Sequence, residues 1–272
     1  MVDVHRAQVE QAFDTARAEG RSLLLPYLTA GLPNPEESVD LFLAMADGGA
    51  DGFEIGIPYS DPLMDGPTIH EAGLTALAAG ATFERSIEIV EQVVARTGLP
   101  VFVMTYANPV LSRGPEAYAA RVAGAGAAGL IVADLPVDEA GRFETATSRS
   151  GLGLVLFVAP TTDDERLRRV IEHQPVFIYG VARLGVTGEQ REVGGDSQLA
   201  ALSQRVRSAT DLPLVAGVGI ATPAMAAEAA QHADGVIVGS ALVRRVLDAP
   251  DAAAAAKSLH TAVADLAAAV RR

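Results

Sequence analysis

The sequence predicts an α/β fold, a closed barrel of eight parallel strands with the helices outside it. Eight short runs rich in apolar and β-branched residues alternate with longer runs of helical period, and this alternation continues to the end of the chain. The connections are short, and 272 residues is about the length of one (β/α)8 barrel. An open doubly wound sheet is the alternative, but such sheets usually have fewer strands and a single Gly-rich turn.

The predicted strands, in chain order, cover residues 22–29, 51–57, 101–106, 129–134, 152–159, 175–180, 213–219 and 235–240. The predicted helices between them cover Glu36–Gly48, Phe83–Arg96, Glu116–Ala123, Asp138–Ser148, Asp163–Glu172, Ser197–Ser208 and Pro223–Gln231. An amphipathic segment at the N-terminus predicts an extra helix that covers the bottom of the barrel. The Ala-rich segment 251–272 predicts a last outer helix. Because no linker, charge block or repeat divides the chain, we expect residues 1–272 to form a single domain.

Composition excludes several classes of function. The chain has no cysteine, which rules out disulfides, thiolate metal sites and a cysteine nucleophile. Its net charge of −13 argues against nucleic acid and anionic membranes as partners, and no apolar run is long enough to span a membrane. The N-terminus lacks the features of a secretory signal, so we expect a cytoplasmic protein. The five histidines show no ligand spacing, and neither a metal nor a cofactor is expected.

One glutamate lies within an otherwise apolar predicted strand, DGFEIGI. Side chains alternate along a barrel strand, so Phe53, Ile55 and Ile57 can pack under the helices while Glu54 points into the barrel. Burial raises the pKa of a carboxyl group, which suits a residue that gives and takes a proton. A buried glutamate that is bonded only to backbone or to an arginine is the structural alternative, and both interpretations stay open at this point.

The loop after this strand, PYSDPLMDGP, carries two aspartates among three prolines. It follows the second strand, and active sites of such barrels form at this end of the strands. The prolines restrict the loop, so Asp61 and Asp65 are expected to be held in place. Both could also be ordinary turn or helix-cap residues, a choice that the residue types alone leave open.

Residues 54–69, EIGIPYSDPLMDGPTI, closely resemble the signature of the tryptophan synthase alpha subunit family. Six further segments resemble the same family in the right order: PYLTAG from Pro26, MTYANP from Met104, DLP from Asp134, RLGVTG from Arg183, GVGI from Gly217 and GS at Gly239. The resemblance covers nearly the whole chain. It implies a (β/α)8 TIM barrel that cleaves indole-3-glycerol phosphate to indole and glyceraldehyde 3-phosphate.

The resemblance assigns roles to individual residues. It implies that Glu54 is the catalytic acid–base, that Asp65 holds the indole N–H, and that Tyr179 lies beside the reacting carbons, although Tyr179 could also be a core aromatic. Tyr27 stands where the family often has phenylalanine. The implied indole pocket consists of Tyr27, Ile69, Met104, Ile131 and Ala133, any of which could equally be a core residue.

Glycine-rich ends of the seventh and eighth strands predict a phosphate site, because glycines let backbone N–H groups approach an anion. With the family's additional glycine, the implied donors are the N–H groups of Gly188, Val218, Gly219, Gly239 and Ser240. The segment 180–196 has five glycines and little periodicity, which is typical of an active-site lid. In the family this lid closes with Thr187 and Arg183, whereas the preceding Gly180-Val-Ala182 departs from the family pattern and leaves closure in doubt.

The family resemblance also implies a partner, a pyridoxal-phosphate beta subunit in an alpha2beta2 assembly, contacted through Pro58, Asp61 and Asn108. Three alternatives stay open: a standalone lyase that releases free indole, a non-catalytic activator of the beta subunit, and another phosphate-binding barrel such as a sugar-phosphate isomerase. Retention of Glu54 and Asp65 argues against the non-catalytic activator, and the loop signature argues against the isomerase.

Overall fold

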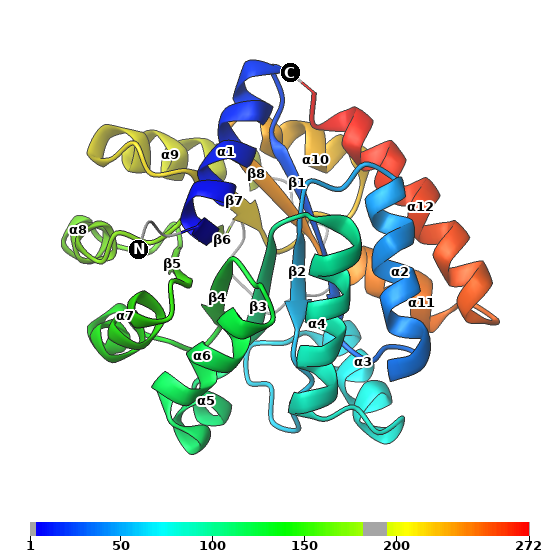
Figure 1. The fold of residues 1–272 in the computed structure, drawn as a ribbon. Coiled ribbons are helices and arrows are strands. Elements are labelled where there is room, and N and C mark those ends of the chain that lie inside the picture. Colours follow the sequence, from blue (N-terminus) through cyan, green and yellow to red (C-terminus); the bar gives the residue numbers. More distant parts are fainter. Residues whose placement is uncertain (1–3, 182–194, 272) are drawn as a thin grey trace.

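The protein forms a closed barrel of eight parallel strands, each paired with the next and the last with the first (Figure 1). The computed structural model describes residues 4–181 and 195–271. The strands are β1 (Leu23–Thr29), β2 (Phe53–Gly56), β3 (Val101–Thr105), β4 (Gly129–Val132), β5 (Gly153–Val158), β6 (Ile178–Val181), β7 (Leu214–Gly217) and β8 (Gly235–Val238). Seven fall within the predicted strand segments, and β6 extends one residue beyond its predicted segment 175–180, so the predicted barrel is confirmed.

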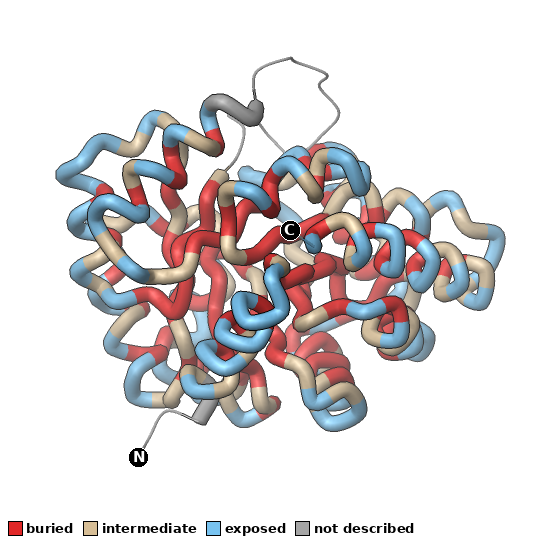
Figure 2. Tube along the Cα trace, turned by 90° about the horizontal axis from the view of Figure 1, so that it is seen from above, coloured by how far each residue is buried: buried red, intermediate tan, exposed pale blue. Residues whose placement is uncertain are grey.

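The helices surround the barrel, with their exposed faces outward and their buried faces toward the strands (Figure 2). They are α1 (Val4–Ala18), α2 (Pro35–Asp47), α3 (Pro67–Ala78), α4 (Phe83–Thr97), α5 (Ala107–Arg113), α6 (Pro115–Gly124), the 3-10 turn η1 (Val137–Glu139), α7 (Ala140–Arg149), α8 (Asp164–Glu172), α9 (Gly195–Ala209), α10 (Pro223–Ala230), α11 (Ser240–Leu247) and α12 (Ala252–Ala269). Within residues 4–181 and 195–271, no helix is long and apolar enough to cross a membrane.

Local sequence sets where several of these helices begin. Asn34, Thr82, Asp163 and Asp251 each accept a hydrogen bond from a backbone N–H three residues later, which caps α2, α4, α8 and α12. The predicted helix ranges included neither α5 nor α11. Helix α5 is short, and its third residue is Pro109, which the first turn of a helix tolerates because its missing N–H is not needed there.

Register decides which side chains enter the barrel lumen. Phe53 packs edge-on against Phe42 of α2 with ring centroids 5.5 Å apart, so it faces the helices. Its neighbour Glu54 therefore faces the lumen, in register with Tyr27 of β1 and Phe102 of β3. The inward orientation predicted for Glu54 is confirmed.

The bottom of the barrel, where the strands begin, is closed by aromatic packing beneath α1. Phe13 of α1 lies edge-on to Phe177, with centroids 6.3 Å apart, and Phe177 lies edge-on to Phe102 at 5.0 Å. All three rings are buried. Helix α1 thus covers the bottom as the sequence predicted (Figure 1).

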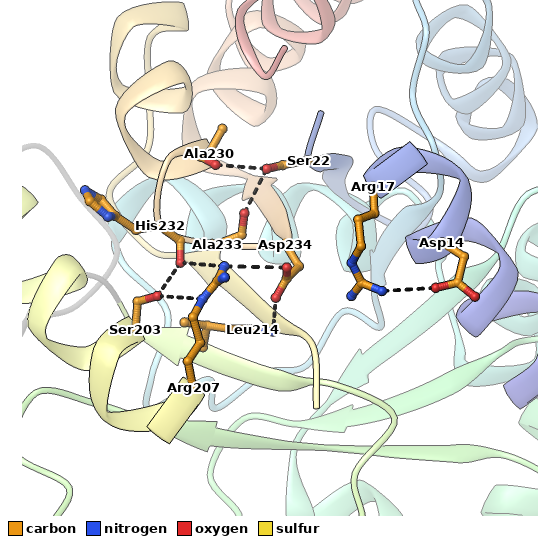
Figure 3. Close-up of polar contacts among 10 residues, drawn as sticks. All are labelled: Asp14, Arg17, Ser22, Ser203, Arg207, Leu214, Ala230, His232, Ala233 and Asp234. Atoms are coloured by element: carbon orange, nitrogen blue, oxygen red, sulfur yellow. Dashed lines mark hydrogen bonds and ion pairs between the residues drawn. The ribbon is translucent and has the colours of Figure 1, made fainter. Parts of the chain in front are cut away.

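A polar network ties α9, α10 and the starts of β1, β7 and β8 together at the same end (Figure 3). The fully buried Ser22 hydroxyl lies 2.8 Å from the carbonyl oxygen of Ala233 and 3.1 Å from that of Ala230. Asp234 accepts the N–H of Leu214 at 3.0 Å and forms an ion pair with Arg207 at 3.6 Å. These contacts fix where the strands start, and therefore which residues reach the opposite end.

We expect Ser22→Ala to lower the free energy of unfolding by about 1–2 kcal/mol, because it leaves buried carbonyl oxygens without this donor. Urea unfolding at pH 7 measures the change. The exposed Ser148→Ala on α7 is the matched control and should change stability by less than about 0.5 kcal/mol. Equal stability of the two variants would show that the Ser22 hydroxyl does not support the barrel.

Candidate active site

Glu54 is a buried carboxyl group without a full set of partners. Its side chain is only 2% exposed, and its Oε2 atom has no hydrogen-bond partner within the described part of the chain. Burial, and then the negative charge of Asp65, raise the pKa of Glu54 to about 8. A purely structural glutamate would be expected to have both oxygens satisfied. The unpartnered oxygen therefore favours the functional interpretation of Glu54.

Asp65 lies in the loop between β2 and α3 and is half-buried. The hydroxyl of Tyr106 donates a 2.6 Å hydrogen bond to its Oδ1 and accepts the N–H of Met64 at 3.2 Å. Burial raises the pKa of Asp65, while this hydrogen bond and the nearby His70 act in the opposite direction. The residue that caps α3 is Gly66, with no side-chain cap bond, so Asp65 is not a helix cap.

Asp61, the other aspartate of this loop, has the simpler environment. It is exposed and accepts a 2.5 Å hydrogen bond from the hydroxyl of Ser60. Of the two aspartates, only Asp65 is therefore partly buried and fixed by a hydrogen bond from another loop.

Two tyrosines fill the lumen above Glu54 by leaning over glycines on the next strand. Tyr27 of β1 covers Gly56 of β2, and Tyr179 of β6 covers Gly217 of β7. A β-carbon at either glycine would collide with the tyrosine hydroxyl. Burial is the main cause that raises the pKa of both phenols; the charge of Asp65 and then that of Glu54 add to it for Tyr27, and the charge of Glu54 adds to it for Tyr179. Glu54 and the two hydroxyls thus share one small region.

Apolar residues line the rest of the predicted indole pocket. Met104 is in register with Gly56 and Ile131, which puts both Met104 and Ile131 on the lumen face. Ile69 of α3 is buried, and Ala133 follows β4 with intermediate exposure. The residues proposed from the sequence therefore do gather at one end of the barrel.

Sequence reasoning missed two residues of this site. Phe157 of β5 packs against Tyr179 with ring centroids 4.8 Å apart. Alternation along LGLVLFVA would have placed it on the lumen face. Tyr106 is the partner of Asp65 and lies in the segment MTYANP, but no local pattern says which loop a tyrosine reaches.

The ends of β7 and β8 provide backbone groups for an anion. Val218 and Gly219 both have positive φ, 67° and 82°, so the chain turns sharply directly after β7. A β-branched residue in this region is strained, which is typical of functional turns. Gly239 caps α11 without a side-chain bond, and Ser240 is its first residue. Helix N-termini of this kind attract anions.

The remaining predicted residues fall in two groups. Arg183, Thr187 and Gly188 lie outside the described residues, as does most of the lid segment 180–196. Pro58, proposed as a partner contact with Asp61, lies on the loop after β2. Asn108, the third proposed contact, is the second residue of α5 and not a loop residue, and it donates a 2.8 Å hydrogen bond to the Tyr59 hydroxyl. The described residues contain no group of three or more side chains that could hold a metal.

Family models, curated proteins and solved structures all match this chain to tryptophan synthase alpha chains. A family model described as tryptophan synthase alpha chain matches residues 13–271. The tryptophan synthase alpha chain of Salinispora arenicola is 46% identical over 260 residues, 96% of each chain. That of Streptomyces coelicolor is 43% identical over 256 residues, 94% of each chain.

Solved structures agree with these relatives. A structure of Mycobacterium tuberculosis tryptophan synthase matches with a TM-score of 0.89 and 38% identity, over 97% of this chain and 98% of that chain. Tryptophan synthase subunit alpha from Legionella pneumophila matches with a TM-score of 0.86 and 32% identity, over 97% and 98%.

The raised pKa of Glu54 predicts a stability difference between the wild type and Glu54→Gln that depends on pH. The folded state binds the proton up to about pH 8, whereas the unfolded chain releases it near its ordinary pKa of 4.5. The folded wild type therefore loses stability as pH rises through this window. Glutamine cannot ionise, so the variant should gain roughly 3–5 kcal/mol relative to wild type between pH 4 and 9.

Urea unfolding of both proteins across this pH range measures the difference. Parallel stability curves would mean that the Glu54 pKa is ordinary and that the carboxyl is not desolvated.

Proposed function

Because the chain belongs to the tryptophan synthase alpha chain family, we propose that it cleaves indole-3-glycerol phosphate at the mouth of the barrel, with Glu54, Asp65 and Tyr179 as the catalytic residues. Members of the family are lyases of tryptophan biosynthesis that form indole and glyceraldehyde 3-phosphate. The observation that carries this assignment is the buried Glu54 carboxyl, with its unpartnered oxygen and raised pKa, at the same end of the barrel as the backbone groups of β7 and β8.

The reaction needs one proton delivered and one removed. Glu54, protonated at neutral pH because of its raised pKa, gives its proton to C3 of the indole. This step makes an indoleninium cation, and Asp65 accepts a hydrogen bond from its N–H and stabilises the charge. The C3–carbinol bond then breaks, its electron pair returns to the indole ring, and the carbinol hydroxyl gives its proton to the Glu54 carboxylate. The carboxyl is restored, and the products are indole and an aldehyde.

The surrounding residues orient the substrate for this exchange. Tyr179 lies within the electrostatic reach of Glu54 and lines the space for the reacting carbons. Tyr27, Ile69, Met104, Ile131 and Ala133 form the apolar pocket for the indole ring, and Phe157 extends it on the β5 side. An apolar pocket excludes water, which strengthens the interaction between Asp65 and the cation.

The phosphate is held mainly by backbone in this proposal. The donors are the N–H groups of Val218, Gly219, Gly239 and Ser240, with Gly188 from the segment outside the described residues. The strained backbone of Val218 and the start of α11, where no side chain caps the backbone N–H groups, support this assignment. A backbone cradle also suits a chain with a net charge of −13, because it needs no cluster of basic side chains.

Alpha chains of this family work with a beta subunit, and we propose an alpha2beta2 assembly in which Pro58, Asp61 and Asn108 contact the partner. Next to them in the β2–α3 loop lie Leu63 and Met64, which are 79% and 52% exposed. Exposed large apolar residues on a loop are typical of an interaction surface. The same loop holds Asp65, so a partner on this surface would stand close to the catalytic residues.

Glu54→Gln should abolish cleavage of indole-3-glycerol phosphate, with kcat at least about 10³-fold lower, because glutamine cannot donate or accept the proton. Binding of a glycerol-phosphate ligand should stay within about twofold, since the cradle lies on β7 and β8. Indole formation and ligand titration measure the two effects. Glu172→Gln, an exposed glutamate on α8, is the matched control and should keep full activity. Normal turnover by Glu54→Gln would show that another group is the acid.

Addition of the beta subunit should increase indole production from this chain strongly, by about tenfold or more. Leu63→Ala should weaken that response while leaving the activity of the isolated chain unchanged, because the Leu63 side chain is 79% exposed. Steady-state assays with and without the beta subunit measure both. High turnover without the partner, and no further increase with it, would favour the standalone lyase. Absence of cleavage in either condition would favour the non-catalytic activator.

A further inference from the structure

Tyr27 places a second phenol hydroxyl, in addition to that of Tyr179, on the face of the lumen that holds Glu54. Tyr27 and Glu54 are direct neighbours in the register of β1 and β2, and paired residues of neighbouring strands point to the same face. Tyr27 is buried, and the charges of Asp65 and Glu54 both raise its pKa. The hydroxyl is therefore close enough to sense the ionisation of Glu54.

The ring of Tyr27 is held between two glycines on opposite sides. A β-carbon on Gly239 would lie 3.5 Å from Cδ1 of the ring, an ordinary contact, and a β-carbon on Gly56 would collide with the hydroxyl end. The ring thus extends from the backbone cradle at β8 to β2, where Gly56 is two residues beyond Glu54 on the same face. Because backbone confines the ring at both ends, the position of the hydroxyl is fixed.

Thr29 anchors this hydroxyl. The Thr29 Oγ1 and Tyr27 Oη atoms are 3.3 Å apart in a buried pair, and either can be the donor. When Thr29 donates to Tyr27, the phenol proton is free for another acceptor in the lumen. The unpartnered Oε2 of Glu54 is a buried acceptor in the same region.

We propose that Tyr27 is a positioning residue for the cleavage: with its hydroxyl held by Thr29, it donates a hydrogen bond to the Glu54 carboxylate that exists between the two proton transfers. This inference rests on the proposed function. No atom is transferred from Tyr27; its hydrogen bond forms when Glu54 loses its proton to the indole ring and weakens when Glu54 recovers a proton from the carbinol. The bond stabilises the ionised acid and keeps it facing the substrate.

Other titratable groups face the same region and must be considered with Glu54. Asp65 raises the pKa of Glu54, and Tyr179 lies on the β6 side. Tyr106 donates to Asp65, and His70 lies near Asp65. Replacement of Tyr27 by phenylalanine leaves these four groups in place, so a change in the titration of Glu54 reports the lost hydroxyl.

The test compares Tyr27→Phe with wild type as full chains, alone and with the beta subunit. Phenylalanine keeps the ring between Gly56 and Gly239 and removes only the hydroxyl. We expect kcat to fall about tenfold, the size of one hydrogen bond to a charged group, with KM within about twofold. The basic limb of the kcat/KM profile should move to higher pH by about half a unit to one unit, because the carboxylate loses a donor.

Two further variants sharpen the result. Thr29→Val frees the hydroxyl from its anchor and should shift the limb in the same direction by a smaller amount. Tyr118→Phe is the matched control: its hydroxyl donates a 3.0 Å bond to Thr105 in an equally buried pair, but it lies on α6 outside the lumen. This control should leave the basic limb of the kcat/KM profile at the wild-type pH.

Two outcomes would overturn the proposal. In the first, Tyr27→Phe has the same kcat and the same basic limb of the kcat/KM profile as wild type. In the second, kcat falls but the basic limb stays at the wild-type pH, which would indicate a packing role only. Direct titration of Glu54 by carboxyl ¹³C NMR in the two proteins gives the same comparison without substrate. If wild type itself fails to cleave indole-3-glycerol phosphate, the proposed function fails, while the NMR shift still decides whether Tyr27 supports the Glu54 carboxylate.

Discussion

Removal of the Glu54 carboxyl from water is the interaction on which the rest of this molecule depends. A buried carboxyl with an unpartnered oxygen is costly, and it persists only because the strands around it are fixed from all sides. The closed barrel supplies that rigidity, since every strand has two neighbours and no free edge. The pKa of about 8 is the chemical result: the same burial that weakens the fold keeps a proton on the acid at neutral pH.

The two ends of the barrel differ in their contacts: packing and buried hydrogen bonds lie at the bottom, and the loops of the candidate site lie at the top. At the bottom, the edge-on aromatic rings under α1 and the network around Ser22 and Asp234 set the strand starts. At the top, three successive residues at the start of α5 join three loops. Tyr106 bonds to Asp65, the N–H of Ala107 bonds to Asp134 at 2.7 Å, and Asn108 bonds to Tyr59. The segment after β3 therefore holds both the β2–α3 loop and the loop after β4.

The sequence predicted most of the fold and the centre of the site, and the reasons are specific. Alternation in DGFEIGI put Glu54 in the lumen, because period-two patterning is local and the barrel obeys it. The partner of Asp65 was not predictable in this way. Tyr106 is 41 residues away, and only the barrel closure brings the two loops together. Helix α5 was missed because seven residues are too few to show a helical period. The tyrosine and glycine pairs were missed because they join neighbouring strands, which no single segment reveals.

Those pairs, Tyr27 with Gly56 and Tyr179 with Gly217, have a consequence for how the cavity can diversify. In each pair, the tyrosine side chain of one strand fills the space over the glycine of the next strand. A smaller residue in place of the tyrosine would leave a cavity, and a larger one in place of the glycine would clash. Coordinated exchange, with the large residue moved to the glycine strand, would conserve volume while rotating the aromatic wall by one strand around the barrel axis. The shape of this cavity can therefore change only when both members of a pair change together.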